Sequence, residues 1–266
     1  MNLSDLSLIN CAAGFGVGAA VGMTGVGGGS LMTPLLVLVF GYAPITAVGT
    51  DLWFAAITKI VGGTLHTHQG TVDWQVLRRM SIGSIPATIL TLLWMAFTRT
   101  AQTSHGTIVH ALGTVLLVTA VAMLARKKIQ AYGARMRTTT AAAFLAAQPW
   151  LTVLAGVVLG VAVPLTSVGA GALGTVMLLY IYPLRMNGSR LAGTDIVHAI
   201  PIVVISGIGH LIMGNVDFVL LISLLVGSIP GVLVGALIAT KSPEIVLRSA
   251  IAAVLGCVSV KLLLAA

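Results

Sequence analysis

The chain carries one set of short motifs twice, in a conserved order, inside sequence that is almost entirely apolar. Most second copies lie 144 residues after the first, and those nearest the N-terminus lie 142 residues after it. Such a duplication predicts two related units that complete one core. The matched motifs are Thr24-x-Val26-Gly27-x-Gly29 with Thr166-x-Val168-Gly169-x-Gly171, Gly49-Thr50-Asp51 with Gly193-Thr194-Asp195, His66 with His210, Gly70-x-Val72-Asp73 with Gly214-x-Val216-Asp217, and Gly83-Ser84-Ile85-Pro86 with Gly227-Ser228-Ile229-Pro230.

The composition places the chain in a lipid bilayer. Hydrophobic residues make up 58% of its 266 residues and charged residues only 8%, whereas a soluble domain carries about a quarter charged residues. Apolar stretches of about 17 residues or more recur, each able to cross ~30 Å of hydrocarbon as a helix. We therefore predict an all-α integral membrane protein with ten hydrophobic segments, at about 6–22, 31–43, 46–64, 80–97, 107–125, 142–163, 173–184, 191–209, 217–239 and 246–264.

The formal charge of +8 does not indicate a nucleic-acid partner, because the charge is unevenly placed along the chain. Eleven of the 14 Lys and Arg residues lie in or flank the connections that follow odd-numbered segments. Cytoplasmic loops carry the excess of Lys and Arg, so we expect these connections in the cytoplasm and both termini in the periplasm. The eleven are Arg78, Arg79, Arg126, Lys127, Lys128, Arg135, Arg137, Arg185, Arg190, Lys241 and Arg248.

Five segments in each half is an odd number, so the two halves should enter the membrane in opposite directions. We predict inverted repeats at residues 1–125 and 142–266, joined by a basic cytoplasmic linker at 126–141. Inverted repeats are typical of secondary transporters, whose substrate binds where the repeats meet. The alternative is four spans per half, with 31–43 and 173–184 as re-entrant half-helices.

Glycine-rich tracts should break the helices in the first hairpin of each repeat. Broken backbone at membrane depth leaves N–H groups at a helix N-terminus, and such groups suit an anion. The alternative is that the glycines only permit close helix packing, as we expect of Gly14, Gly18, Gly22, Gly156 and Gly160. The predicted substrate-binding residues are Thr24, Gly25, Val26, Gly27, Gly28, Gly29, Ser30, Thr50, Lys59, Thr166, Ser167, Val168, Gly169, Gly171 and Thr194.

Ionisable residues within apolar segments are the second signal. A charge at mid-membrane costs at least ~2.5 kcal/mol, so such residues are functional candidates. Asp195 and His198 share one helical face, whereas Asp51 and Lys59 are too far apart to pair within one helix, so Lys59 should reach another segment. The alternative is that these groups pair structurally near the interface. The predicted coupling or proton-carrying residues are Asp51, Asp195, His198, His66 and His210.

The two Gly-x-Val-Asp motifs predict turns between helices. In each motif the glycine would end one helix and the aspartate, Asp73 or Asp217, would cap the next. His66 and His210 precede these turns, and the sequence leaves open whether they stabilise the turn or move protons.

The ordered motifs resemble those of the sulfite exporter TauE/SafE family: the glycine-rich hairpin, Pro34, Ala47-x-Gly49-Thr50 and His66-x3-Gly70-x-Val72-Asp73, each with a counterpart in the second half. The resemblance covers residues 8 to 264. It implies a bacterial inner-membrane carrier for sulfite, sulfonates or related sulfur-containing anions, driven by an ion gradient. The family often has Ser or Asn after the Gly-Thr pair, where this chain has Asp51 and Asp195.

The function predicted from the sequence is therefore secondary transport of a small sulfur-containing anion by alternating access. The expected partners are this anion, a coupling proton or sodium ion, the lipid bilayer and, as an open alternative, a second copy in a homodimer. A passive anion channel of the same architecture is the alternative function. We expect no cofactor, no metal and no enzymatic activity, because an intramembrane metalloenzyme would need a ligand cluster such as HExxH, which the sequence lacks.

Overall fold

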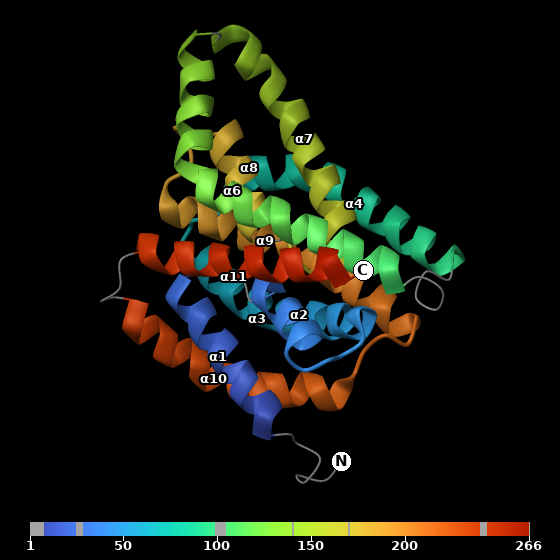
Figure 1. Ribbon diagram of the computed structural model, residues 1–266. Coiled ribbons are helices and arrows are strands. Elements are labelled where there is room, and N and C mark those ends of the chain that lie inside the picture. Colours follow the sequence, from blue (N-terminus) through green and yellow to red (C-terminus); the bar gives the residue numbers. More distant parts are fainter. Residues whose placement is uncertain are drawn as a thin grey trace.

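The computed structural model describes residues 8–24, 29–98, 105–139, 141–169, 171–239 and 244–265, and every regular element within these ranges is a helix. Six helices (α3, α4, α6, α7, α9 and α10) are long and apolar enough to cross a membrane. The helices are α1 (Leu8–Thr24), α2 (Gly29–Leu38), α3 (Pro44–His68), α4 (Trp74–Phe97), α6 (His105–Thr139), α7 (Ala141–Thr166), α8 (Ala172–Ile181), α9 (Gly188–Ile212), α10 (Phe218–Ala239) and α11 (Glu244–Ala265) (Figure 1).

Much of the molecular surface is apolar, as a bilayer requires. Ile82, Leu90 and Ile212 are each more than 60% exposed. Large aliphatic side chains in such numbers on the surface would drive a soluble protein to aggregate, whereas lipid tails solvate them. The described structure is thus that of a multi-pass membrane protein.

Helices α2 and α8 have ten residues each, so each is about 15 Å long. That is about half of a ~30 Å hydrocarbon core, so the apolar segments predicted at 31–43 and 173–184 contain half-helices. Tyr182, directly after α8, bonds to Thr152 in α7, with 2.8 Å between the hydroxyl oxygens. In the first half, Asn10 of α1 donates to the Tyr42 hydroxyl at 3.1 Å. The α1–α2 and α7–α8 pairs are therefore hairpins.

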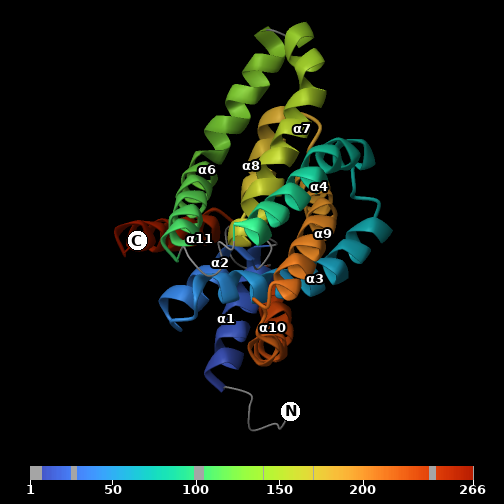
Figure 2. The ribbon, with the colours of Figure 1, turned by 90° about the vertical axis from the view of Figure 1, so that its right-hand side faces the viewer.

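The basic stretch at 126–139 continues α6 as helix. Together with the start of α7 it forms a helical hairpin that projects beyond the other helices (Figures 1 and 2). Arg78 and Arg79, predicted to precede the fourth segment, lie inside α4, which begins at Trp74. Asp73 caps this helix start, and a cap takes precedence over the apolar pattern in setting where a helix begins.

Helix α1 packs most extensively against α10 of the other half. The contact is so close that a Cβ on Gly14 or Gly18 would clash with the backbone of Leu224 or Ser228. A Cβ on Gly227 would clash with the Cys11 carbonyl. Residue numbers rise together in both helices, so α1 and α10 run parallel through an interface of small residues on both sides.

Helices α4 and α7 form the equivalent parallel pair. A Cβ on Gly83 would clash with the Val153 carbonyl, and one on Gly156 with the Met80 carbonyl. A Cβ on Gly160 would clash in the same way with the Ser84 carbonyl. The predicted packing role of the repeated glycines is therefore confirmed for Gly14, Gly18, Gly156 and Gly160, and each glycine interface joins one sequence half to the other.

Two glycines in α1 provide a matched test of this packing. Gly18→Val is expected to destabilise the protein strongly, because the added carbons meet the Ser228 backbone. Gly16 has no neighbouring atom within 4 Å of an added Cβ, so Gly16→Val should leave stability unchanged. Thermal unfolding in detergent, followed by size-exclusion chromatography, measures both. Equal melting temperatures for the two variants would contradict the packing assignment.

Candidate functional site

Helices α3 and α9, which carry the repeated Gly-Thr-Asp motifs, lie side by side and antiparallel. The Trp53 indole donates to the Gly207 carbonyl at 2.9 Å, and a Cβ on Gly63 would meet the Ile200 side chain. Residue numbers thus rise in α3 as they fall in α9. The buried residues Ala55, Ala56 and Ala199 permit this close approach; Val48, Leu52, Val163, Ile202 and Val203 complete the cluster.

Each end of this helix pair is joined to the turn of the opposite repeat. The backbone N–H of Asp217 donates to the Thr50 hydroxyl at 3.0 Å, and that of Asp73 donates to the Thr194 hydroxyl at 2.9 Å. Both threonines are fully buried. The residues expected to line the anion site thus hold the turns in place, with each hydroxyl oxygen accepting a backbone hydrogen bond.

The turns themselves have the predicted caps. Asp73 accepts a hydrogen bond from Val76 N at 3.3 Å, and Asp217 accepts one from Leu220 N at 3.0 Å. Gly70 and Gly214 have φ of +64° and +76°, a region that glycine enters without strain. The helix-capping interpretation of the Gly-x-Val-Asp motifs is confirmed.

Asp51 lies fully buried on α3 and faces the half-helix α2. The Thr33 hydroxyl donates to Asp51 Oδ2 at 2.5 Å, while Oδ1 has no hydrogen-bond partner. The Ser167 side chain, from the α7–α8 connection, lies near the same carboxyl group. Thr33 was not singled out in the sequence, because nothing in a ten-residue apolar helix marks one hydroxyl as the partner of a distant carboxylate.

Asp195 on α9 is equally buried and contacts the other half-helix. A Cβ on Gly174 of α8 would clash with Asp195 Oδ1, which has no hydrogen-bond partner. Lys59 is 4% exposed and interacts electrostatically with both Asp195 and Asp51. The prediction that Lys59 reaches another segment is therefore confirmed. Asp51 and Asp195 lie towards opposite ends of the antiparallel α3–α9 pair. The buried Lys59 lies between them along α3 and interacts electrostatically with both.

The three candidate histidines have different surroundings. His198 Nε2 lies 2.9 Å from the Ser84 hydroxyl of α4, so its ring bonds a serine rather than Asp195, its neighbour on the helix. His210 Nε2 donates to the Pro164 carbonyl at 2.9 Å. His66 Nδ1 lies 2.9 Å from the Thr71 hydroxyl within its own turn. His210 and His198 thus connect α9 to α7 and α4.

The predicted break between α7 and α8 is non-helical from Ser167 to Gly171 over the described residues. Ser167 has φ of +55°, and Gly169 and Gly171 have +114° and +133°. The Thr166 hydroxyl accepts from Val168 N at 3.1 Å and donates to the Ala162 carbonyl at 2.7 Å. Val168 is buried, whereas the buried Ser167 hydroxyl has no hydrogen-bond partner.

The first glycine-rich tract is only partly described. Thr24 ends α1, and Gly29 and Ser30 begin α2. The predicted site residues Gly25, Val26, Gly27 and Gly28 lie outside the described residues.

Five buried side-chain oxygen atoms of the described residues lack a hydrogen-bond partner, and three of them belong to predicted site residues: Asp51 Oδ1, Asp195 Oδ1 and Ser167 Oγ. Buried oxygens normally find partners, so these are candidates for contact with a ligand or a proton. Within the described ranges no three His, Cys, Asp or Glu residues lie close enough to hold a metal ion. The available chemistry is proton exchange by carboxyl groups and charge pairing with Lys59.

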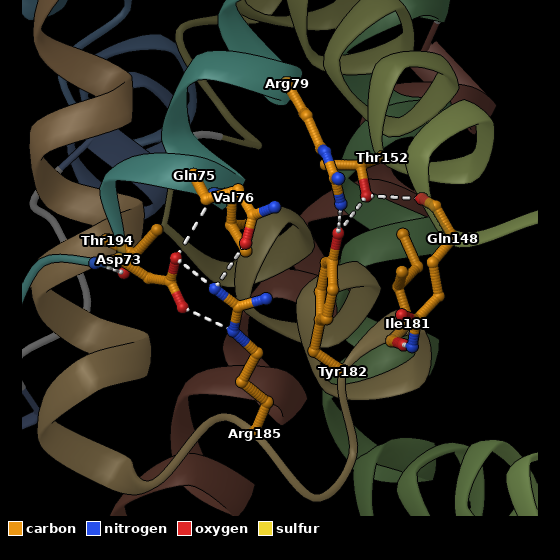
Figure 3. Close-up of polar contacts among 10 residues, drawn as sticks. All are labelled: Asp73, Gln75, Val76, Arg79, Gln148, Thr152, Ile181, Tyr182, Arg185 and Thr194. Atoms are coloured by element: carbon orange, nitrogen blue, oxygen red, sulfur yellow. Dashed lines mark hydrogen bonds and ion pairs between the residues drawn. The ribbon is translucent and has the colours of Figure 1, made fainter. Parts of the chain in front are cut away.

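A second polar network, which the sequence did not predict, lies at the start of α4 (Figure 3). Arg185 binds Asp73 through Nε at 2.7 Å and Nη2 at 2.8 Å, and Nη2 also reaches Gln75 Oε1 at 2.9 Å. Arg79 Nη1 donates to the Tyr182 hydroxyl at 3.3 Å. The network connects the α3–α4 turn of the first half to the α8–α9 connection of the second.

Comparison with known proteins agrees with this architecture. The model of the family described as "Sulfite exporter TauE/SafE" matches residues 10–262. The "Probable membrane transporter protein YjnA" of Bacillus subtilis (strain 168) is 40% identical over 84% of this chain and 86% of its own length. "Probable membrane transporter protein YdhB" of the same organism is 29% identical over 89% and 92%. No solved structure matches the chain significantly. The chain therefore belongs to the sulfite exporter TauE/SafE family of membrane transporters.

Proposed function

We propose that the protein is a secondary transporter that moves sulfite, a sulfonate or a related small sulfur-containing anion across the bacterial inner membrane. The observation that carries the proposal is that Asp51 and Asp195 are both buried, one beside the half-helix α2 and the other beside the half-helix α8, with the buried Lys59 between them along α3. Buried ionisable groups at broken helices are typical of substrate and coupling sites in transporters.

The charges of this site account for coupling to protons. With both carboxyl groups ionised, Lys59 balances only one of them, and an incoming anion would meet a site of net negative charge. Protonation of one aspartate removes that repulsion, while Lys59 and the N-terminal end of α8 still attract the anion. Anion and proton would thus bind together, and their joint transport links anion movement to the proton gradient. A sodium ion bound by the same oxygens is the other form of coupling.

The two halves are proposed to be inverted repeats. Their equivalent helices α3 and α9 are antiparallel. In the repeat α1 corresponds to α7 and α4 to α10, so the packed pair α1–α10 is equivalent to the packed pair α7–α4. If the α1–α2 and α7–α8 hairpins each return to the face they entered, then α3, α4 and α6 would cross the membrane in the first half. The helices α9, α10 and α11 would cross it in the second half, so each half still has an odd number of crossings. The basic connections would face the cytoplasm and both termini the periplasm. The bodies that move during alternating access would each contain helices of both halves.

An uptake assay in proteoliposomes tests the function. Sulfite, sulfate, thiosulfate and a sulfonate are offered with and without an imposed pH gradient, and then with a sodium gradient. We expect accumulation of at least one sulfur anion above its external concentration when the gradient is present. Uptake that stops at equilibration under every gradient would indicate a passive channel, and the absence of any flux would contradict the proposal.

A further inference from the structure

Two arginines converge on one aromatic residue at the start of α4 (Figure 3). The Arg185 guanidinium lies 5.6 Å from the centre of the Tyr182 ring, and Arg79 donates to the hydroxyl of the same side chain. Thr152 binds that hydroxyl from α7 at 2.8 Å. Tyr182 is thereby fixed, and it holds two cationic groups at one end of the protein.

The network contains more positive than negative charge. Asp73 forms an ion pair with Arg185, whereas Arg79 donates a hydrogen bond to the neutral Tyr182 hydroxyl. The Arg185 side chain is 35% exposed and binds the carboxylate with two donors. The same planar pair of N–H groups fits the oxygens of sulfite or a sulfonate.

The opposite end of the protein lacks this arrangement. In the repeat, Asp217 corresponds to Asp73, Ser223 to Arg79 and Val219 to Gln75. Asp217 caps α10 through Leu220 N, and among the described residues no arginine pairs with it. Both ends therefore have the capped turn, but among the described residues only the α3–α4 turn is bound by an arginine.

The network also connects to Asp195, a residue of the candidate site. Asp73, which holds Arg185, donates its backbone N–H to Thr194, and Thr194 directly precedes the buried Asp195. Arg185 is therefore linked through Asp73 and Thr194 to Asp195, whose carboxyl group is proposed to carry protons.

We propose that Arg79 and Arg185 form an entry site for the transported oxyanion, at which the anion replaces Asp73 as the ligand of Arg185. This inference rests on the proposed function and adds to it a binding site at one end only. When the anion takes Arg185, the connection at residues 182–187 is released from the start of α4, and that end opens. The transported anion itself therefore opens this end.

The repeat provides a matched pair of variants for the test. Asp73→Asn keeps the helix cap, because Asn caps as well as Asp, but it removes the negative charge that competes for Arg185. We expect it to lower the KM for the anion about three- to tenfold, the size of the net contribution of one ordinary hydrogen bond. The effect should appear only when anion is supplied at the arginine-bearing end. Asp217→Asn should change the KM at neither end. Labelling of a cysteine at the exposed Lys128 identifies which end faces outward in each vesicle preparation.

Arg185→Gln should have the opposite effect and raise the KM at that end at least about tenfold, with the KM at the other end unchanged. A KM that shifts equally at both ends, or equal effects of the two Asp→Asn variants, would overturn the entry site and leave a structural ion pair. Sulfite quenching of Trp74 fluorescence, compared between wild type and Arg185→Gln, measures binding without transport. Binding without flux in the wild type would count against the proposed function alone; flux with unchanged binding and KM in Arg185→Gln would count against the entry site alone.

Discussion

Asp195→Asn is expected to abolish gradient-driven accumulation of the anion while anion exchange across the membrane continues. Asn keeps the shape of the side chain and removes only the group that gains and loses a proton. The Oδ1 atom of Asp195 is buried and has no hydrogen-bond partner. His198, which lies three residues further along α9, bonds to Ser84 instead. The carboxyl group is thus free of the fixed hydrogen bond that Thr33 gives to Asp51. Accumulation under a pH gradient and exchange of labelled anion at equal pH measure the two activities.

Asp51→Asn is the matched comparison on the equivalent helix. Because Thr33 donates to Asp51, the Asn amide can still accept that hydrogen bond through its oxygen, and the folded protein should be retained. We expect its accumulation to fall as well, since one of the two carboxyl groups that interact electrostatically with Lys59 is lost. If both variants accumulated the anion with the same pH dependence as wild type, a coupling role would be contradicted. The aspartates would then be structural partners of Lys59.

Lys59→Met is expected to have the second large effect, loss of all anion flux, exchange included. Lys59 is buried and interacts electrostatically with both aspartates, so its removal leaves the anion without its charged partner. Removing one member of a buried charge group also destabilises a protein by about 3–5 kcal/mol, a large share of a total stability of about 5–15 kcal/mol. Loss of folded protein alone would therefore not establish the binding role.

The double variant Lys59→Met/Asp195→Asn separates the two effects. It removes one positive and one negative charge together, and the folded protein should return because less charge is left unbalanced. Melting temperature in detergent and labelled-anion exchange are measured on the same preparation. A stable double variant without exchange supports the binding role of Lys59, whereas a stable double variant with wild-type exchange would exclude it.

The sequence was sufficient to predict the features that depend on nearby residues and occur in both halves. The Gly-x-Val-Asp motifs predicted both turns and caps, because capping depends on residues within a few positions of one another. The spacing of Asp51 and Lys59 likewise indicated a partner on another helix. Burial of charged side chains in apolar segments identified the central group, since only a functional or paired role keeps charges there.

Contacts between the halves could not be derived from the sequence. A repeat identifies equivalent residues, such as Thr50 and Thr194, but not the turn to which each hydroxyl binds. Arg185 was assigned to a cytoplasmic connection by its charge alone, although its partner Asp73 lies 112 residues away. The start of α4 at Trp74 and the extension of α6 to Thr139 were also missed, because polar and basic residues form helix outside the apolar segments.

The glycine interfaces between α1 and α10 and between α4 and α7 bear on how the protein is made. The ribosome delivers α1 more than 190 residues before α10 and α4 more than 40 residues before α7. Until these later helices have been inserted, the glycine faces of α1 and α4 contact lipid instead of protein. The half that was duplicated is therefore not a unit that can finish folding by itself, and the native contacts of the first half wait for synthesis of the second.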